Sequence, residues 1–188
     1  MAGRYEKEKL KEISFPLGGI GTGSVGLAGN GRFVDWQIAN RPNVHSVNGF
    51  THLAVKAQRG DTVVDARVLQ GDFAPPYSGG ETSGLRGNNG FGQGPDRCTM
   101  AGVPHFQDVV FEGEFPLASL KFSQPTFPGE VRLDAMNPFI PSNSADSSLP
   151  AAFFTVTLHN PTQDELDYTV CFSLNNIAAP TAENRREL

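Results

Sequence analysis

The run Asn137-Pro138-Phe139-Ile140-Pro141 decides the fold, and it is followed by the polar residues 142–148 and the apolar stretch 151–159. A residue that precedes proline is biased away from helical backbone, so Asn137, Ile140 and Leu149 are predicted to be extended. We therefore expect two extended pieces that bracket a polar loop, and a strand that leaves this loop.

Other stretches alternate apolar and polar residues with a period of two, which is the pattern of a half-buried strand. Nine ranges read as extended, and about eight strands are predicted among them: 13–17, 32–38, 51–58, 62–69, 106–111, 117–122, 131–135, 151–159 and 166–174. No long helix is predicted, so the fold class is all-β, an antiparallel β-sandwich. The last two strands are expected to pair through a polar turn at 160–165 and to place apolar residues in the core: Phe154, Val156, Leu158, Val170, Phe172 and Leu174.

Two turns contain motifs that also occur in other kinds of protein. The tripeptide Arg59-Gly60-Asp61 is shared with integrin ligands, but its position between two alternating strands favours a hairpin turn. Residues 21–26 match the dinucleotide-binding pattern G-x-G-x-x-G, which requires a helix to open at the glycines. Residues 27–31 cannot open a helix, because three of the five are Gly or Asn. The seven glycines of 18–31 instead predict positive φ angles or close backbone approach.

Composition excludes several functional classes. The net charge of −5 comes without a basic cluster, so nucleic acid is not an expected partner. Residues 1–12 form a charged lead-in without a secretory signal, and no apolar run reaches the roughly 20 residues of a membrane span, so a cytoplasmic location is expected. Cys98 and Cys171 are far apart; two unpaired thiols are favoured over a disulfide.

Three runs together resemble the N-terminal β-sandwich domain of glycoside hydrolase family 116, the family of non-lysosomal glucosylceramidase and bacterial β-glucosidases. They are Pro128-Gly129-Glu130-Val131-Arg132-Leu133, the Asn137–Pro141 run, and the glycine-rich run 16–24. The first two are specific, and the resemblance extends from about Ile13 to about Leu174. The domain is thus expected to cover 13–188, and because the family's sandwich is longer, its C-terminal end is expected to be missing.

The resemblance implies a full-length retaining β-glycosidase that acts on β-glucosides, with glucosylceramide as one candidate substrate. Such an enzyme needs two carboxyl groups about 5–5.5 Å apart. In the family, both belong to a C-terminal (α/α)6 toroid, so no catalytic, cofactor or metal residue is assigned in this chain. The toroid is the expected partner, and the chain alone is expected to be inactive.

The interface with the toroid is expected to include the glycine run and the following strand, with the residues Gly19, Gly21, Gly23, Arg32, Asp35 and Trp36. Trp36, the only tryptophan, could also stack on a sugar ring beside Asp35, but a position on an apolar face with Val34 and Ile38, as a core or interface residue, is favoured. At a domain interface, Trp36 would be partly exposed in this chain. The loop 71–97, rich in Gly, Ser and Pro, is expected to be the least ordered internal segment.

Two alternative functions remain. A stand-alone carbohydrate-binding module would need an exposed aromatic platform, for which Trp36, Tyr5, Tyr77, Tyr168 and the phenylalanines are available. A sandwich used only for protein association is the other alternative. The four histidines show no metal-ligand spacing with Cys, Asp or Glu.

Overall fold

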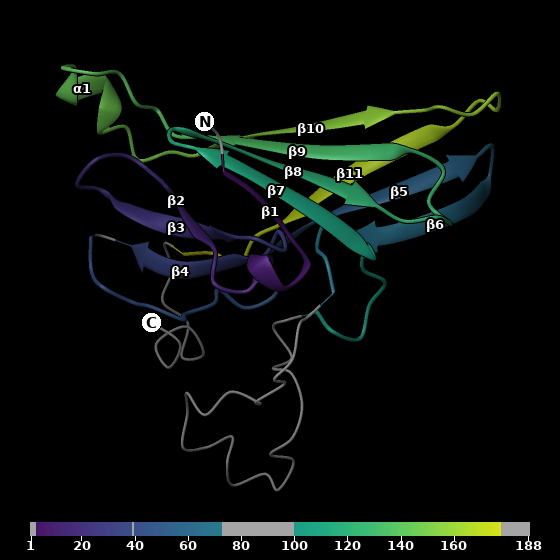
Figure 1. Cartoon of the computed structure of the whole chain (residues 1–188), viewed down its shortest axis with the longest axis horizontal. Coiled ribbons are helices and arrows are strands. Elements are labelled where there is room, and N and C mark those ends of the chain that lie inside the picture. The colour runs from purple at the N-terminus through teal and green to yellow at the C-terminus, as the bar shows by residue number, and fades with distance from the viewer. Residues whose placement is uncertain (1–2, 39, 73–99, 178–188) are drawn as a thin grey trace, which may run out of the picture.

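The computed structural model describes residues 3–38, 40–72 and 100–177, and within them the chain forms eleven strands and two short helices (Figure 1). The strands lie in two layers, as the alternation predicted. The predicted loop 71–97, except its first two residues, and the residues Tyr77 and Cys98 lie outside the described residues. In the described part, no helix is long and apolar enough to cross a membrane.

One layer is a five-stranded antiparallel sheet in the order β1-β7-β8-β9-β10. Its strands are β1 (Gly3–Glu6), β7 (Asp108–Glu114), β8 (Leu117–Ser123), β9 (Glu130–Met136) and β10 (Phe153–His159). The 3-10 helix η1 (Lys7–Leu10) follows β1, so the charged lead-in is a strand and a helical turn. No strand was predicted at β1, because its four residues carry no alternation.

The other layer consists of two three-stranded antiparallel sheets, in the orders β2-β3-β4 and β11-β5-β6. Their strands are β2 (Ser14–Leu17), β3 (Gly23–Ala28), β4 (Phe33–Ile38), β5 (His52–Arg59), β6 (Thr62–Val68) and β11 (Asp167–Ser173). Figure 1 shows these two sheets next to each other along the larger sheet. The hairpin predicted at Arg59–Asp61 is confirmed, with Gly60 at a φ of 53°.

The core is one cluster between the layers, to which all three sheets contribute. Its residues with no measurable exposure are Leu17, Leu27, Ala57, Phe106, Leu120 and Leu133. The buried residues of β5, β8 and β9 occupy alternate positions, which is the period of a strand with one face toward the core.

The predicted pairing of the last two strands is wrong. β10 pairs with β9 in the large sheet and β11 pairs with β5 in the other layer, so residues 160–166 cross from one layer to the other. A polar connection of this length can close a hairpin or bridge two layers, and the alternation within each strand is the same in both cases. Register depends on the neighbouring strand, which local sequence does not identify.

The predicted burial is also wrong for β11. Phe154, Val156 and Leu158 are half-buried and pack against the core, whereas Val170, Phe172 and Leu174 are exposed, Phe172 by 50%. Both β10 and β11 are edge strands, so among the described strands each has a neighbour on one side only. The alternation identified the apolar face of each strand but not its position at an edge.

The predicted alternation of β4 is interrupted at Asp35, whose φ is 51°. The register between β3 and β4 shifts between Ser24 and Gly26. Because of this bulge, Phe33 and Trp36 are the buried residues of the strand, while Val34 and Ile38 are not. Strand β3 itself lies within the glycine run, where a tight turn was predicted.

Candidate domain interface

Asn137 joins the two stretches from which the fold was predicted. Its side chain is 3% exposed; its amide oxygen accepts a hydrogen bond from the Gly18 N–H at 2.6 Å, and its amide nitrogen donates to the Pro16 carbonyl at 2.8 Å. The backbone N–H of Asn137 donates to the Pro116 carbonyl. This residue thus ties the end of β9 to the beginning of the glycine run and to the β7–β8 turn.

A second set of contacts holds the loop after Asn137 against the glycines. The Ile20 N–H donates to the Ser147 carbonyl at 2.8 Å, and a Cβ on Gly19 would overlap the Leu149 carbonyl. Ser147 lies in the short helix α1 (Ser144–Ser147), and its buried hydroxyl exchanges hydrogen bonds with the backbone of Ile140. The predicted close backbone approach is therefore confirmed at Gly19.

Positive φ angles are confirmed for four glycines of the run, Gly18, Gly21, Gly23 and Gly31. Gly21 and Gly23, with Gly18 and Asn137, line a hollow of about 240 Å³ whose other walls include Phe115 and Asn40. Because strand β3 rather than a helix begins at Gly23, this site does not have the phosphate-binding geometry of a dinucleotide fold.

The six residues expected at the interface do not form one site. Gly19, Gly21 and Gly23 lie together at the hollow. Arg32 lies at the far end of the β3–β4 hairpin, because Gly23 pairs with Ile38 whereas Leu27 pairs with Phe33. Asp35 is a structural acceptor at the bulge: its carboxylate accepts hydrogen bonds from the Ser14 hydroxyl at 2.5 Å and from the His45 N–H at 2.6 Å.

Trp36 is a core residue with 6% exposure, so the expected partial exposure in this chain is wrong. Its ring packs edge-on against Phe33 at 6.4 Å, and its indole N–H donates to the Phe33 carbonyl at 3.3 Å. Its backbone is held by Ser46 and Asn43. The indole face is therefore not available to a sugar ring, and it cannot serve as the anchor of a domain interface.

An exposed apolar patch, which was not predicted from the sequence, lies at this end of the sandwich, and its member Phe115 also lines the hollow. Leu117, Met136 and Phe153 are adjacent on β8, β9 and β10, and each is exposed on the outer face of the large sheet. The exposed rings of Phe115 and Phe139 pack edge-on at 5.1 Å beside them. We call these five residues the end patch. A signal existed in the sequence, since Phe153-Phe154 and Ala135-Met136 are neighbouring apolar residues that cannot both face the core.

Beyond this patch, the outer face of β8, β9 and β10 is polar. Positions further along the same strands and faces are occupied by Ser119, Lys121, Arg132, Asp134, Thr155 and Thr157. Apolar side chains thus gather at the end of the sandwich that carries the glycine run. A local apolar patch with polar surroundings is typical of an interaction surface.

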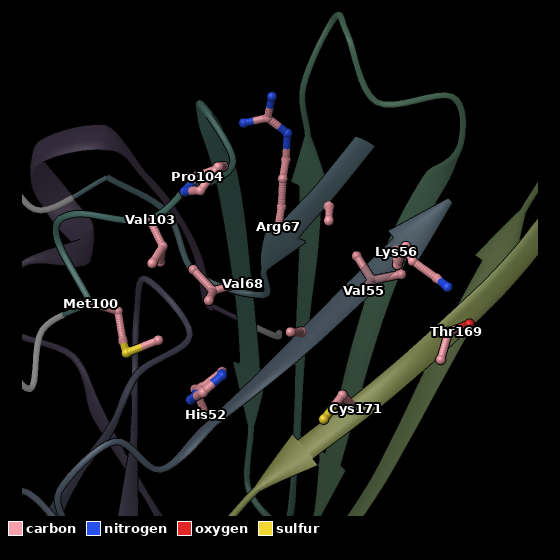
Figure 2. A pocket seen from close by; sticks show the side chains of 12 residues that line it. His52, Val55, Lys56, Arg67, Val68, Met100, Val103, Pro104, Thr169 and Cys171 are labelled. Carbon is pink, nitrogen blue, oxygen red and sulfur yellow. The ribbon is translucent and has the colours of Figure 1, made fainter. Parts of the chain in front are cut away.

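A second hollow, of about 400 Å³, lies on the outer face of the β11-β5-β6 sheet (Figure 2). Its lining includes the apolar residues Ala54, Ala66 and Val68 of the sheet, Met100 and Val103 of the segment before β7, and the side chains of His52 and Cys171. Cys171 is a free, exposed thiol. Among the described residues, no carboxylate lines either hollow, and no group of three or more His, Cys, Asp or Glu could hold a metal ion.

Comparison with known proteins gives one family. The sequence model described as "beta-glucosidase 2, glycosyl-hydrolase family 116 N-term" matches residues 14–187, which is nearly the whole chain. No curated protein sequence matches the chain significantly.

Proposed function

The chain belongs to the N-terminal domain family of glycosyl-hydrolase family 116, and on this basis we propose that it is the non-catalytic N-terminal domain of a retaining β-glycosidase that hydrolyses β-glucosides. The family match over residues 14–187 is the observation that carries the proposal. Glycoside hydrolysis uses a pair of carboxyl groups, and the family resemblance assigns both of them to the C-terminal toroid rather than to this domain.

In this proposal, the end of the sandwich with the glycine run and the end patch packs against the catalytic toroid of the same protein and contributes to one wall of its cleft. Leu117, Met136 and Phe153 would supply the buried apolar centre of the interface, and the polar outer face beyond them would supply its rim. The substrate would be a β-glucoside, with glucosylceramide as one candidate, and the location would be the cytoplasm.

The first test is made on this chain alone. We expect no hydrolysis of an aryl β-glucoside by the purified 188-residue chain. Turnover above background that persists through repeated purification would refute the non-catalytic role.

The second test is made on the full-length glycosidase. Leu117→Lys places a charge in the end patch, and Ser123→Lys places the same charge on the same strand and face at the opposite end. We expect Leu117→Lys to lower kcat/KM for an aryl β-glucoside about tenfold or more, as for a central interface residue, and Ser123→Lys to change it less than about twofold. Equal effects of the two substitutions would contradict the proposed docking end.

A carbohydrate-binding role is the second candidate, because the end patch contains two exposed aromatic rings, Phe115 and Phe139. Trp36 cannot contribute to this platform. Calorimetric titration of the isolated chain with β-linked gluco-oligosaccharides distinguishes a carbohydrate-binding module from a docking domain. Saturable heat of binding that Phe115→Ala abolishes would favour the binding module. The absence of binding heat would favour the docking domain.

A further inference from the structure

The hollow of about 400 Å³ arises from small side chains on the outer face of the β11-β5-β6 sheet (Figure 2). The buried residues of β5 are Leu53, Val55 and Ala57. The alternate positions, Ala54 and Lys56, therefore face outward. Two rows of residues cross this face in register, and they are Cys171-Ala54-Val68 and Thr169-Lys56-Ala66. Because alanine, cysteine and threonine are small, these rows leave room above the sheet that larger side chains would occupy.

The segment before β7 adds an apolar side to the hollow. The Val68 N–H donates to the Pro104 carbonyl at 3.1 Å, so residues 100–104 run beside β6. The side chains of Met100 and Val103 thus line the hollow next to Val68 (Figure 2). Binding sites for small molecules are mostly apolar and typically have volumes of about 300–1,000 Å³, so the hollow has the lining and the size of such a site.

The charge of Lys56 decides which ligand the hollow suits. Lys56 faces outward between Thr169 and Ala66, neither of which is charged. The other permanently charged side chain of the lining, Arg67, forms an ion pair with Asp65 at 2.7 Å, so its charge is already neutralised. Within the described part of the chain, no Asp or Glu lines the hollow. An apolar surface with a free ammonium group beside it is complementary to an anion that carries an apolar chain.

We propose that this hollow binds an aliphatic carboxylate. Its carboxylate would pair with the Lys56 ammonium, and its chain would lie against Ala54, Val68 and Met100. A hydrogen bond between two charged groups is stronger than one between neutral groups, and each buried CH₂ group of the chain adds to the affinity. An uncharged chain would gain nothing from the ammonium, and a small anion would leave the apolar residues in water. Both parts of the ligand are therefore needed.

This site is separate from the proposed docking contact. The hollow lies on the outer face of the β11-β5-β6 sheet, whereas the end patch lies on the outer face of the large sheet, in the other layer. Ligand binding therefore does not depend on the role of the chain in a glycosidase. It does not depend on the edges of the sheets either, because the lining residues belong to a sheet face and to the segment 100–104.

The first test is calorimetric titration of the purified 188-residue chain with octanoate, 1-octanol and acetate. We expect saturable binding of octanoate, binding of octanol that is about tenfold or more weaker because it lacks the charge, and no binding of acetate. Lys56→Gln should lower the affinity for octanoate to that for octanol. The matched control is Lys121→Gln, which removes a positive charge from the outer face of the large sheet and should change octanoate binding less than about twofold.

A second variant fills the hollow. Ala54→Phe should abolish the binding of octanoate and of octanol, whereas Thr157→Phe, which places the same ring on the outer face of β10, should leave both intact. Emission from the buried Trp36 shows whether each variant is folded. The proposal would be overturned by the absence of saturable octanoate binding, by equal effects of the two lysine substitutions, or by binding that survives Ala54→Phe in a folded chain.

The thiol of Cys171 gives a measurement that needs no substitution, because it is free, exposed and part of the lining. Octanoate should slow the reaction of Cys171 with iodoacetamide and reach its full effect at the concentration that saturates the calorimetric titration, whereas acetate should not. Peptide mass spectrometry separates the products of Cys171 and Cys98. Octanoate binding that leaves the rate at Cys171 unchanged would place the ligand elsewhere and overturn the proposal.

Discussion

Asn137→Ala tests whether one side chain holds the glycine run against the end of β9. The substitution removes the acceptor of the Gly18 N–H and the donor to the Pro16 carbonyl. It leaves the backbone hydrogen bond from the Asn137 N–H to the Pro116 carbonyl in place. The chain after residue 137 therefore keeps its position relative to the β7–β8 turn, and only the contact with residues 16–18 is lost.

The magnitude follows from the burial of the lost groups. A hydrogen bond contributes about 1 kcal/mol net, and a buried partner left unsatisfied costs about 1–3 kcal/mol. Water can enter from the hollow beside Gly18, which limits the second contribution. We expect Asn137→Ala to lower the free energy of unfolding by about 2–4 kcal/mol.

The assay is urea unfolding followed by the fluorescence of Trp36, at a concentration where the chain is monomeric. The matched control is Asn143→Ala, the same change in an exposed helix cap, where the side chain accepts from the Asp146 N–H at 3.1 Å. Loss of this cap should cost about 1 kcal/mol or less. A cost below about 0.5 kcal/mol for Asn137→Ala, or one equal to that of the control, would refute the reasoning.

Three further predictions concern burial. Trp36 should emit as a buried indole in this chain and be poorly quenched by acrylamide; red-shifted, readily quenched emission would contradict its place in the core. Phe111→Ala should cost about 3–5 kcal/mol, but Phe172→Ala, at a half-exposed residue, only about 1.5–2.5 kcal/mol, and equal costs in urea unfolding would contradict this difference in burial. Burial raises the pKa of the Tyr168 hydroxyl, so the protonated hydroxyl should stabilise the fold at neutral pH, and this stabilisation should be lost as the pH rises above the usual range of tyrosine. Tyr168→Phe should therefore reduce the loss of unfolding free energy at alkaline pH. The same pH profile for the variant and the unchanged chain would contradict this prediction.

Fold class and most strand positions could be predicted from the sequence because they depend on local alternation. Strands 51–58, 62–69 and 117–122 differ from β5, β6 and β8 by one residue at most at each end. The pairing of β10 and β11 could not be predicted, because a polar connector and two alternating strands are compatible with one sheet or with two. The end of the alternation at Asp35 also had no local signal, since the bulge depends on the register with β3.

The surroundings of the glycine run were predicted in part. The glycine run was identified correctly as a place of close approach, because seven glycines within 14 residues leave the backbone without side chains that would keep a neighbouring segment away. The segment that approaches Gly19 belongs to the same domain, at Leu149, and the approach of the catalytic domain to this run stays a prediction. Trp36 was grouped with Val34 and Ile38 because the alternation was counted through Asp35, whereas the buried residue that shares its side of β4 is Phe33. The end patch was missed because an extra apolar residue beside a core position does not change the period of the strand.

The end patch presents side chains on a sheet face whose backbone groups are already paired, so a partner there is recognised by shape and apolar contact. Its apolar residues Leu117, Met136 and Phe153 lie at one end of three adjacent strands, and polar residues continue the same face beyond them. A charge at Leu117 should therefore lower the activity of the full-length enzyme, because it would be buried in the proposed contact with the toroid. The same charge at Ser123 should change the activity little, because Ser123 lies on the same face at the other end of β8.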